Sequence, residues 1–234
     1  MSPRDWLSAL SESKPITKLR LSYHTIEFGK TDIHLCTLRD RQEFSDPDGV
    51  SEDLGINSAV WPLFCVVWPS SLVLAHFINY FDTDSKRILE VGCGMALSSL
   101  LLKKQSADIT ATDYHPEVEA FLERNALLNE GEVIDFERVD WAAKEDELGL
   151  FDLIIGSDLL YEDIHIELLS RFLENHAKHT CEVIIVDPGR GSKNKLAGCM
   201  EAFGFMASQQ KPVDTDAYLD ADFKGFILRY VRVG

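Results

Sequence analysis

The chain has 234 residues with an ordinary apolar fraction of 45%, which suits one domain with a sizeable core and an N-terminal extension. Its formal net charge of −16 argues against nonspecific binding to nucleic-acid backbones; it either serves solubility alone or favours basic partners. The five cysteines form no Cys-x-x-Cys pair and are odd in number, which predicts a reduced, cytoplasmic chain.

The first 57 residues are expected to form the N-terminal extension. A short helix is expected at Met1–Leu10, followed by an antiparallel hairpin of Leu19–Phe28 and Ile33–Leu38, where apolar and polar residues alternate. The acid-rich segment Asp40–Asp53 predicts a solvated loop, with docking of a basic substrate as the alternative.

The apolar stretch Ala59–Ile78 raises the question of a membrane span. Two prolines, two serines and a histidine interrupt it, so we expect a turn followed by a buried helix. The N-terminus lacks the basic-then-apolar pattern of a signal peptide. No membrane partner is therefore expected.

Residues 58–234 are expected to form the main domain, in which strand and helix patterns alternate. Strands are expected at Arg87–Val91, Asp108–Thr112, Ile134–Val139, Phe151–Ile155 and Cys181–Val186. Helices are expected at Ala96–Lys104, Pro116–Leu128, Ile164–His176 and Asn194–Phe203. Two final strands, Phe205–Gln210 and Phe223–Val231, have no helix between them. The pattern predicts an α/β, Rossmann-like doubly wound sheet of seven strands, mostly parallel, with an antiparallel C-terminal hairpin.

The segment between the first strand and the first helix of this domain has the form of a ligand-binding turn. The strand ends in Glu90, and Gly92, Cys93 and Gly94 lead into an apolar helix. Glycines there let a ligand approach the backbone and the helix N–H groups closely. The third glycine of the dinucleotide fingerprint is replaced by Leu97. Glu90 would repel a pyrophosphate but can accept hydrogen bonds from amino and hydroxyl groups, which favours S-adenosylmethionine (SAM).

Acids also follow the second and third strands of the domain. Asp113, with Tyr114 beside it, lies about 20 residues past the glycine turn, where a doubly wound fold holds a ribose. The alternative is a helix cap before Pro116. Asp140 can accept from an adenine amino group and Trp141 can lie against the adenine face. The alternative there is a core tryptophan with a capping aspartate.

The fourth strand turns abruptly from apolar to small and polar residues. Gly156 and Ser157 are expected to leave room for a ligand, and Asp158 and Tyr161 to face one cavity. A carboxylate can orient an amine nucleophile, and an aromatic ring can hold a cation by its face. The alternative is a helix cap with a core tyrosine.

Three further features carry weaker signals. Trp68 precedes a helix that either covers the cofactor or packs only on the core. Asp187 and Arg190 either contact a substrate or pair with each other across a turn. The spacing of His176 and His179 is loose and no acid or cysteine joins them, so no metal site is predicted.

Taken together, four motifs resemble those of one enzyme family. They are Glu90-Val-Gly-Cys-Gly94, Asp158-Leu-Leu-Tyr161, Trp68-Pro-Ser-Ser71 and Asp187-Pro-Gly-Arg190. From Ser58 to Arg190 the chain resembles the seven-β-strand SAM-dependent methyltransferases. Within these it is most similar to methyltransferase family 16, the protein-lysine methyltransferases, and nearest to the electron-transfer flavoprotein β-subunit branch and its bacterial relatives.

The resemblance implies a role for seven residues. Those implied to contact SAM are Trp68, Gly92, Asp113, Trp141 and Ser157. Asp158 and Tyr161 are implied to line the methyl-acceptor channel. The implied activity is transfer of the SAM methyl group to a lysine amine of a protein, leaving S-adenosylhomocysteine.

Three rival functions stay open at this point. A small-molecule methyltransferase would share every SAM residue. A NAD-dependent reductase is opposed by Leu97 and by the lack of a Tyr-x-x-x-Lys pair. A SAM-binding protein without turnover is opposed by Asp158 and Tyr161. The absence of Asn-Pro-Pro-Tyr after the fourth strand argues against methylation of amides or nucleobase amines.

Overall fold

The computed structural model of the protein describes residues 20–40, 46, 49–58, 61–143, 146–160 and 163–234. The helix expected at Met1–Leu10 lies outside these residues. The strands are β1 (Leu21–Phe28), β2 (Thr31–Leu38), β3 (Arg87–Val91), β4 (Asp108–Asp113), β5 (Asp135–Arg138), β6 (Phe151–Ser157), β7 (Ala177–Asp187), β8 (Met206–Gln210) and β9 (Phe226–Arg232). The helices are α2 (Val50–Asp53), η2 (Trp61–Cys65, 3₁₀), α3 (Pro69–Ile78), α4 (Leu97–Lys104), α5 (Val118–Leu128), α6 (Asp163–His176), α7 (Lys193–Ala202) and η3 (Thr215–Ala217, 3₁₀).

Seven strands form the main sheet in the order β5-β4-β3-β6-β7-β9-β8. The first five are parallel, and β9 is antiparallel to both of its neighbours. The predicted doubly wound sheet with an antiparallel C-terminal pair is confirmed. The largest differences from the expected strand bounds are in β7, which begins four residues early, directly after α6, and in β9, which begins three residues late at Phe226.

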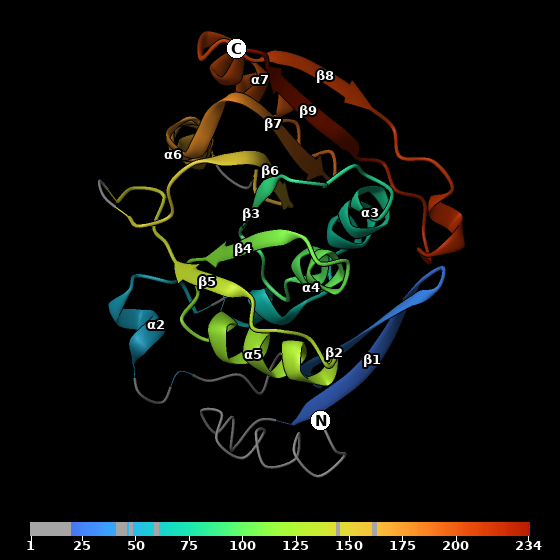
Figure 1. Cartoon of the computed structure of the whole chain (residues 1–234). Helices are drawn as coiled ribbons and strands as arrows, with labels where there is room; N and C mark the ends of the chain where they lie inside the picture. Colours follow the sequence, from blue (N-terminus) through green and yellow to red (C-terminus); the bar gives the residue numbers. More distant parts are fainter. Residues whose placement is uncertain (1–19, 41–45, 47–48, 59–60, 144–145, 161–162) are drawn as a thin grey trace.

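The two faces of the sheet bury different side chains because neighbouring residues of a strand point to opposite sides. Ile88 and Ile155 join the core cluster that contains α3, α4 and α5. Leu89 and Ile154 join the cluster that contains α6 and α7. Figure 1 shows these two helical layers on either side of the sheet. Strands covered on both faces explain the nearly continuous apolar runs in the sequence.

The most apolar stretch folds as the sequence predicts. By length and composition alone Trp61–Ile78 would suffice to span a membrane, with a mean hydropathy of 1.6. In the structure it is divided into η2 and α3, and Pro69 occupies the first turn of α3, where a missing N–H is tolerated. Val73, Leu74 and Ile78 of α3 are buried in the core. The expected turn and buried helix are confirmed.

The N-terminal extension contains the predicted hairpin and one helix that was not predicted. β1 and β2 pair antiparallel without interruption, and Figure 1 shows them beside α4 and α5. The expectation of a loop throughout Asp40–Asp53 is wrong, because Val50–Asp53 form α2. The Asp46 carboxylate accepts the Glu52 N–H at 2.9 Å, and Gly49 enters the helix at a φ of 70°. This local capping stabilises a helical turn within the acidic segment.

Candidate active site

The glycine turn joins β3 to α4 at the carboxyl edge of the sheet. Gly92 and Gly94 have φ values of 60° and 51°, in the region that favours glycine. A Cβ placed on Gly94 would lie 3.0 Å from the Phe64 carbonyl oxygen. The Cys93 N–H donates to the Thr112 carbonyl at 2.9 Å, which ties the turn to the end of β4. The predicted strand, tight turn and helix are confirmed.

Glu90, predicted to accept from a ligand, is held by the protein in this structure. Its side chain is buried, and Oε2 accepts the Ser99 N–H at 2.9 Å and the Ser99 hydroxyl. Burial raises the pKa of Glu90 to about 7, against the lowering effect of the Ser99 hydrogen bonds. The Glu90 side chain therefore links the end of β3 to the first turn of α4. No pattern in the sequence indicated that Ser99 would be its partner.

Asp113 joins the end of β4 to the glycine turn. Its Oδ2 accepts the Gly94 N–H at 2.8 Å, and its Oδ1 accepts the His115 N–H at 2.9 Å. Burial raises the pKa of this carboxyl despite the backbone hydrogen bonds. The neighbouring Tyr114 hydroxyl donates to the Leu54 carbonyl at 2.6 Å. The alternative of a helix cap is wrong, because α5 begins at Val118 with Glu117 at its N-cap and no side-chain cap hydrogen bond. The Asp113 carboxylate instead contacts the glycine turn that a ligand would approach.

The segment containing η2 closes over the same turn. The Phe64 carbonyl faces Gly94, and the Phe64 ring stacks on His115 with ring centroids 4.2 Å apart. Burial lowers the pKa of His115 to about 4. The Trp68 indole N–H donates to the Leu63 carbonyl at 3.3 Å. The two Trp-Pro pairs of the sequence pointed to this segment, but no sequence pattern predicted that Phe64 would contact the glycine turn.

The residues after β5 contact their own loop and α6. Asp140 is exposed, and its Oδ1 accepts the Ala142 N–H at 2.8 Å. Trp141 is half-buried and lies edge-on to His165, with ring centroids 6.4 Å apart. The Asp140 hydrogen bond belongs to a turn within its own loop, and no helix begins there among the described residues.

Asp158 lies at the carboxyl end of β6, next to the half-buried Ser157, in a left-handed conformation with a φ of 60°. Its N–H donates to the Val186 carbonyl at 2.9 Å. Its side chain is only 5% exposed and forms an ion pair with the Arg190 guanidinium. Burial raises the pKa of Asp158; Arg190 lowers it and Asp187 raises it. Tyr161, the predicted partner of Asp158, lies outside the described residues.

The loop after β7 corrects one sequence expectation. Arg190 pairs with Asp158, so its pairing with Asp187 across the turn is wrong. Asp187 Oδ2 instead accepts the Gly189 N–H at 2.8 Å. Its Oδ1 is buried and has no hydrogen-bond partner among the residues that the structure describes. The pairing was missed because it joins two loops 32 residues apart in the sequence.

The room expected beside Gly156 is occupied by a side chain. A Cβ on Gly156 would lie 2.7 Å from Leu159 Cδ1, and one on Gly92 would lie 2.5 Å from Leu159 Cδ2. The left-handed turn at Asp158 brings Leu159 back against the ends of β3 and β6. Both glycines therefore accommodate Leu159 in this structure, a residue that the sequence did not single out.

The histidines near the end of α6 serve other contacts. His176 Nε2 lies 3.0 Å from the Asp146 carboxylate, and its Nδ1 lies 3.0 Å from the Gly149 carbonyl. Within the described ranges, no group of three or more His, Cys, Asp or Glu side chains is placed to hold a metal ion.

The site as a whole gathers the ends of three adjacent strands. β3 supplies the glycine turn, β4 supplies Asp113 and β6 supplies Asp158, and Val91 of β3 pairs directly with Gly156 of β6. This is the edge at which open α/β sheets bind ligands. It combines the glycine turn, the carboxylates of Asp113 and Asp158 and the guanidinium of Arg190.

Comparison with known proteins identifies proteins of similar sequence. Residues 55–196 match the model of a family described as lysine methyltransferase. Protein N-lysine methyltransferase METTL21A of Danio rerio is 28% identical over 117 residues, 47% of this chain and 54% of that protein. The electron transfer flavoprotein beta subunit lysine methyltransferase of Mus musculus is 27% identical over 133 residues, 55% of this chain and 51% of the relative. Histone-arginine methyltransferase METTL23 of Xenopus laevis is 34% identical over 118 residues, 46% of this chain and 50% of the relative. The chain thus spans about half the length of these curated relatives.

Solved structures share the fold at low sequence identity. A TehB-like SAM-dependent methyltransferase from Corynebacterium glutamicum has a TM-score of 0.56 and 13% identity, covering 80% of this chain and all of that one. Magnesium protoporphyrin IX methyltransferase from Synechocystis, solved with bound SAM, has a TM-score of 0.55 and 16% identity, covering 83% and 89%.

Proposed function

This chain belongs to the lysine methyltransferase family, and we propose that it transfers the methyl group of SAM to a lysine amine of a protein. The observation that carries the proposal is Asp158. It is a buried carboxylate at the end of β6, on the strand that pairs with the one leading into the glycine turn. An amine held by this carboxylate would lie next to SAM bound at the glycine turn.

The glycine turn fits SAM by its backbone form. Gly92 and Gly94 have positive φ values, and a Cβ on Gly94 would lie 3.0 Å from the Phe64 carbonyl, so the tight turn into α4 requires glycine, as expected of a turn that binds SAM. The residues proposed to hold the ligand are Gly92, Gly94, Asp113 and Ser157 at the ends of β3, β4 and β6, Trp141 after β5, and Trp68 before α3. When bound, SAM supplies an electrophilic methyl group on a sulfonium. Glu90 and Cys93 are proposed to shape the turn, with Tyr114 and Asp140 on its flanking loops.

Asp158 is proposed to orient the acceptor amine. A lysine ammonium has an ordinary pKa of about 10.4 and must lose a proton before its nitrogen attacks. The carboxylate attracts the ammonium, which releases its proton to water as it enters the buried site, where desolvation favours the neutral form. The carboxylate then accepts a hydrogen bond from the neutral amine and holds its nitrogen in place. Alignment of the nitrogen with the methyl carbon and the leaving sulfur supplies most of the rate. Arg190, which pairs with Asp158, has to share or release the carboxylate as the amine enters.

A protein acceptor is favoured over a small molecule by the relatives. Among the matched relatives, one is named a protein N-lysine methyltransferase, one a histone-arginine methyltransferase and one a histidine protein methyltransferase homolog. Lysine is the acceptor in the family description. The five cysteines are free thiols, which supports a reducing compartment such as the cytoplasm.

The test is transfer of label from SAM to the proteome of a strain that lacks the gene. The purified chain is incubated with isotopically labelled SAM and the extract. The proposal predicts label in a small number of protein bands, on lysine. Label confined to small molecules, or failure of the chain to bind SAM in a calorimeter, contradicts it.

A further inference from the structure

The outer edges of β1 and β2 in the N-terminal hairpin differ in their backbone hydrogen bonding. The Arg39 N–H donates to the Arg20 carbonyl at 2.8 Å, which fixes the phase of the antiparallel ladder. From the register, even-numbered residues of β1 bond to β2, and the N–H and C=O groups of Tyr23, Thr25 and Glu27 point away from it.

The outer edge of β2 is satisfied by side chains of α5. The Cys36 N–H donates to Asn125 Oδ1 at 2.7 Å, and the His34 N–H donates to Asn129 Oδ1 at 2.8 Å. The Asn129 amide returns a hydrogen bond to the His34 carbonyl at 2.7 Å. This edge cannot accept another strand.

The outer edge of β1 has no such cover in the described part of the chain. The outward backbone groups of Tyr23, Thr25 and Glu27 have no partner among the described residues. Sheet edges are commonly protected by lysine, proline or a bulge. β1 contains neither lysine nor proline, and its register with β2 is unbroken. Tyr23 is 57% exposed on this strand.

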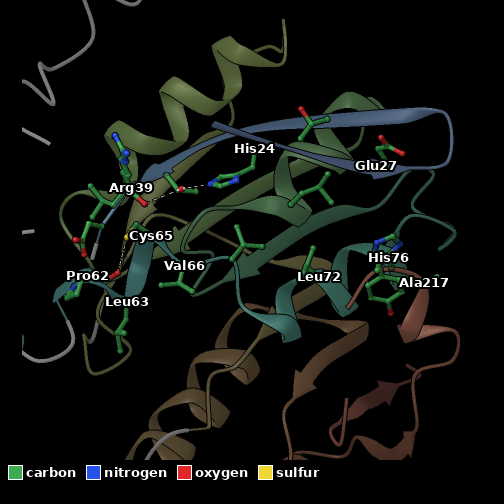
Figure 2. Close-up of a pocket in the computed structure, with 17 residues that line it drawn as sticks. His24, Glu27, Arg39, Pro62, Leu63, Cys65, Val66, Leu72, His76 and Ala217 are labelled. Atoms are coloured by element: carbon green, nitrogen blue, oxygen red, sulfur yellow. Dashed lines mark hydrogen bonds between the residues drawn. The ribbon is translucent and has the colours of Figure 1, made fainter. Parts of the chain in front are cut away.

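A groove with a volume of about 1060 Å³ runs beneath this edge, and we name it the hairpin groove. Its lining includes four consecutive β1 residues, 24–27, so the strand edge itself forms one wall. Figure 2 shows Arg39 near one end of the groove and His76 near the other. Leu63, Val66 and Leu72 supply apolar side chains along the opposite wall. The groove exceeds the usual volume of small-molecule sites, about 300–1,000 Å³.

One end of the hairpin groove is closed by stacked rings. His76 lies 4.6 Å from the Phe28 ring and stacks on Tyr218 with centroids 3.7 Å apart. The wall opposite β1 includes Leu63 and Cys65 of η2. Between them, the Phe64 carbonyl faces the glycine turn on the other side. The groove and the candidate active site are thus separated by one short segment.

We propose that the hairpin groove binds an extended, basic peptide segment of the protein substrate, which adds to β1 as a third strand. An edge with free N–H and C=O groups at every second residue matches an extended chain. Inward-facing side chains of the peptide would enter the groove beside Ile26, and outward-facing ones would lie near the exposed Glu27. Glu27 and Asp40 in the groove lining, together with the net charge of −16, favour a basic segment, and Arg39 lies near one end of the groove (Figure 2). The inference rests on the proposed function, and the docking segment and the methylated lysine are different parts of the substrate.

The test uses a short capped peptide of alternating valine and lysine as the probe, without SAM. Amide hydrogen exchange is followed by NMR. The proposal expects exchange at Tyr23, Thr25 and Glu27 to slow by about tenfold or more, while His24 and Ile26, already bonded to β2, stay unchanged. Absence of this alternation overturns the proposal. Protection that rises with protein concentration alone, without the probe, also overturns it, in favour of a second copy on the edge.

Two modified probes test the backbone directly. One carries N-methyl groups on all valines and the other on all lysines. Edge addition uses the N–H groups of only one alternate set, so one modified probe should lose about tenfold or more in affinity and the other should bind as before. Loss with both, or with neither, contradicts strand addition.

A matched pair of variants completes the experiment. Thr25→Pro removes an outward N–H that the hairpin ladder does not use, and Thr25→Val keeps it. Thr25→Pro should weaken probe binding by about tenfold while Thr25→Val changes it less than about twofold. SAM affinity should be unchanged in both. Lysine transfer without edge protection removes the docking inference alone; edge protection without any transfer removes the proposed function alone.

Discussion

The two halves of the candidate active site are built differently. At the ends of β3 and β4, the Asp113 carboxylate accepts hydrogen bonds from the backbone N–H groups of Gly94 and His115, which hold the glycine turn against β4. At the ends of β6 and β7, a buried carboxylate meets a guanidinium from another loop. The first half depends on backbone shape, and the second on charge. Substitutions in the first half should therefore act by steric clash, and substitutions in the second half by changing the ionisation of Asp158.

The largest effect is expected at the glycine turn. Gly94→Val places side-chain atoms where a Cβ alone comes within 3.0 Å of the Phe64 carbonyl, at a φ of 51°. We expect a loss of SAM affinity of about 100-fold or more in titration calorimetry. Gly198→Val is the matched control, because no atom lies within 4 Å of a Cβ there. Equal SAM affinity in the two variants would remove the turn from the binding site.

Removal of charge at Asp158 tests the other half. Asp158→Asn keeps the size of the side chain and tolerates the left-handed backbone. We expect turnover to fall about 100-fold while SAM affinity changes less than about threefold. Asp152→Asn, at the opposite end of the same strand, should leave turnover intact. A large loss of SAM affinity in Asp158→Asn would contradict the division of roles.

The buried Glu90 predicts a pH dependence of stability. Its pKa is about 7 in the fold against 4.5 for the ordinary group, so the folded state retains a proton that the unfolded state releases. The contribution of Glu90 to the free energy of unfolding should therefore fall by roughly 3 kcal/mol as pH rises from about 4.5 to about 7 and then level off. His115, whose pKa is lowered to about 4, opposes this decline, so the quantity to measure is the difference between the wild type and Glu90→Gln at each pH. Urea unfolding of Glu90→Gln should lack this decline. The control Glu123→Gln, exposed on α5, should retain it.

The smallest effect concerns Arg190. Its guanidinium lowers the pKa of Asp158, so Arg190→Gln should raise that pKa further. The acid limb of the pH–rate profile should move to higher pH, with the rate on the plateau changed less than about threefold. A limb that stays in place would show that the Arg190–Asp158 pair does not control ionisation in the working enzyme.

The same contrast explains what the sequence could predict. The glycine turn was identified because positive φ values and a strand-to-helix transition leave local marks on residue type. The sheet followed from apolar runs alternating with helical patterns. The contact of Arg190 with Asp158 was not predicted, because it depends on how two loops that are distant in the sequence pack together. The contact of Leu159 with Gly156 was not predicted, because it depends on the left-handed conformation of Asp158. The helix at Val50–Asp53 was missed because its cap, Asp46, is one acid among many.

The central claim is tested most directly by locating the transferred methyl group. Proteins labelled by the wild-type chain and by Asp158→Asn are digested and read by tandem mass spectrometry. The account predicts methyl groups on lysine side chains with the wild type and a loss of about 100-fold in their yield with Asp158→Asn. Methyl groups on histidine or arginine, or lysine methylation at full yield without the Asp158 carboxylate, would contradict it.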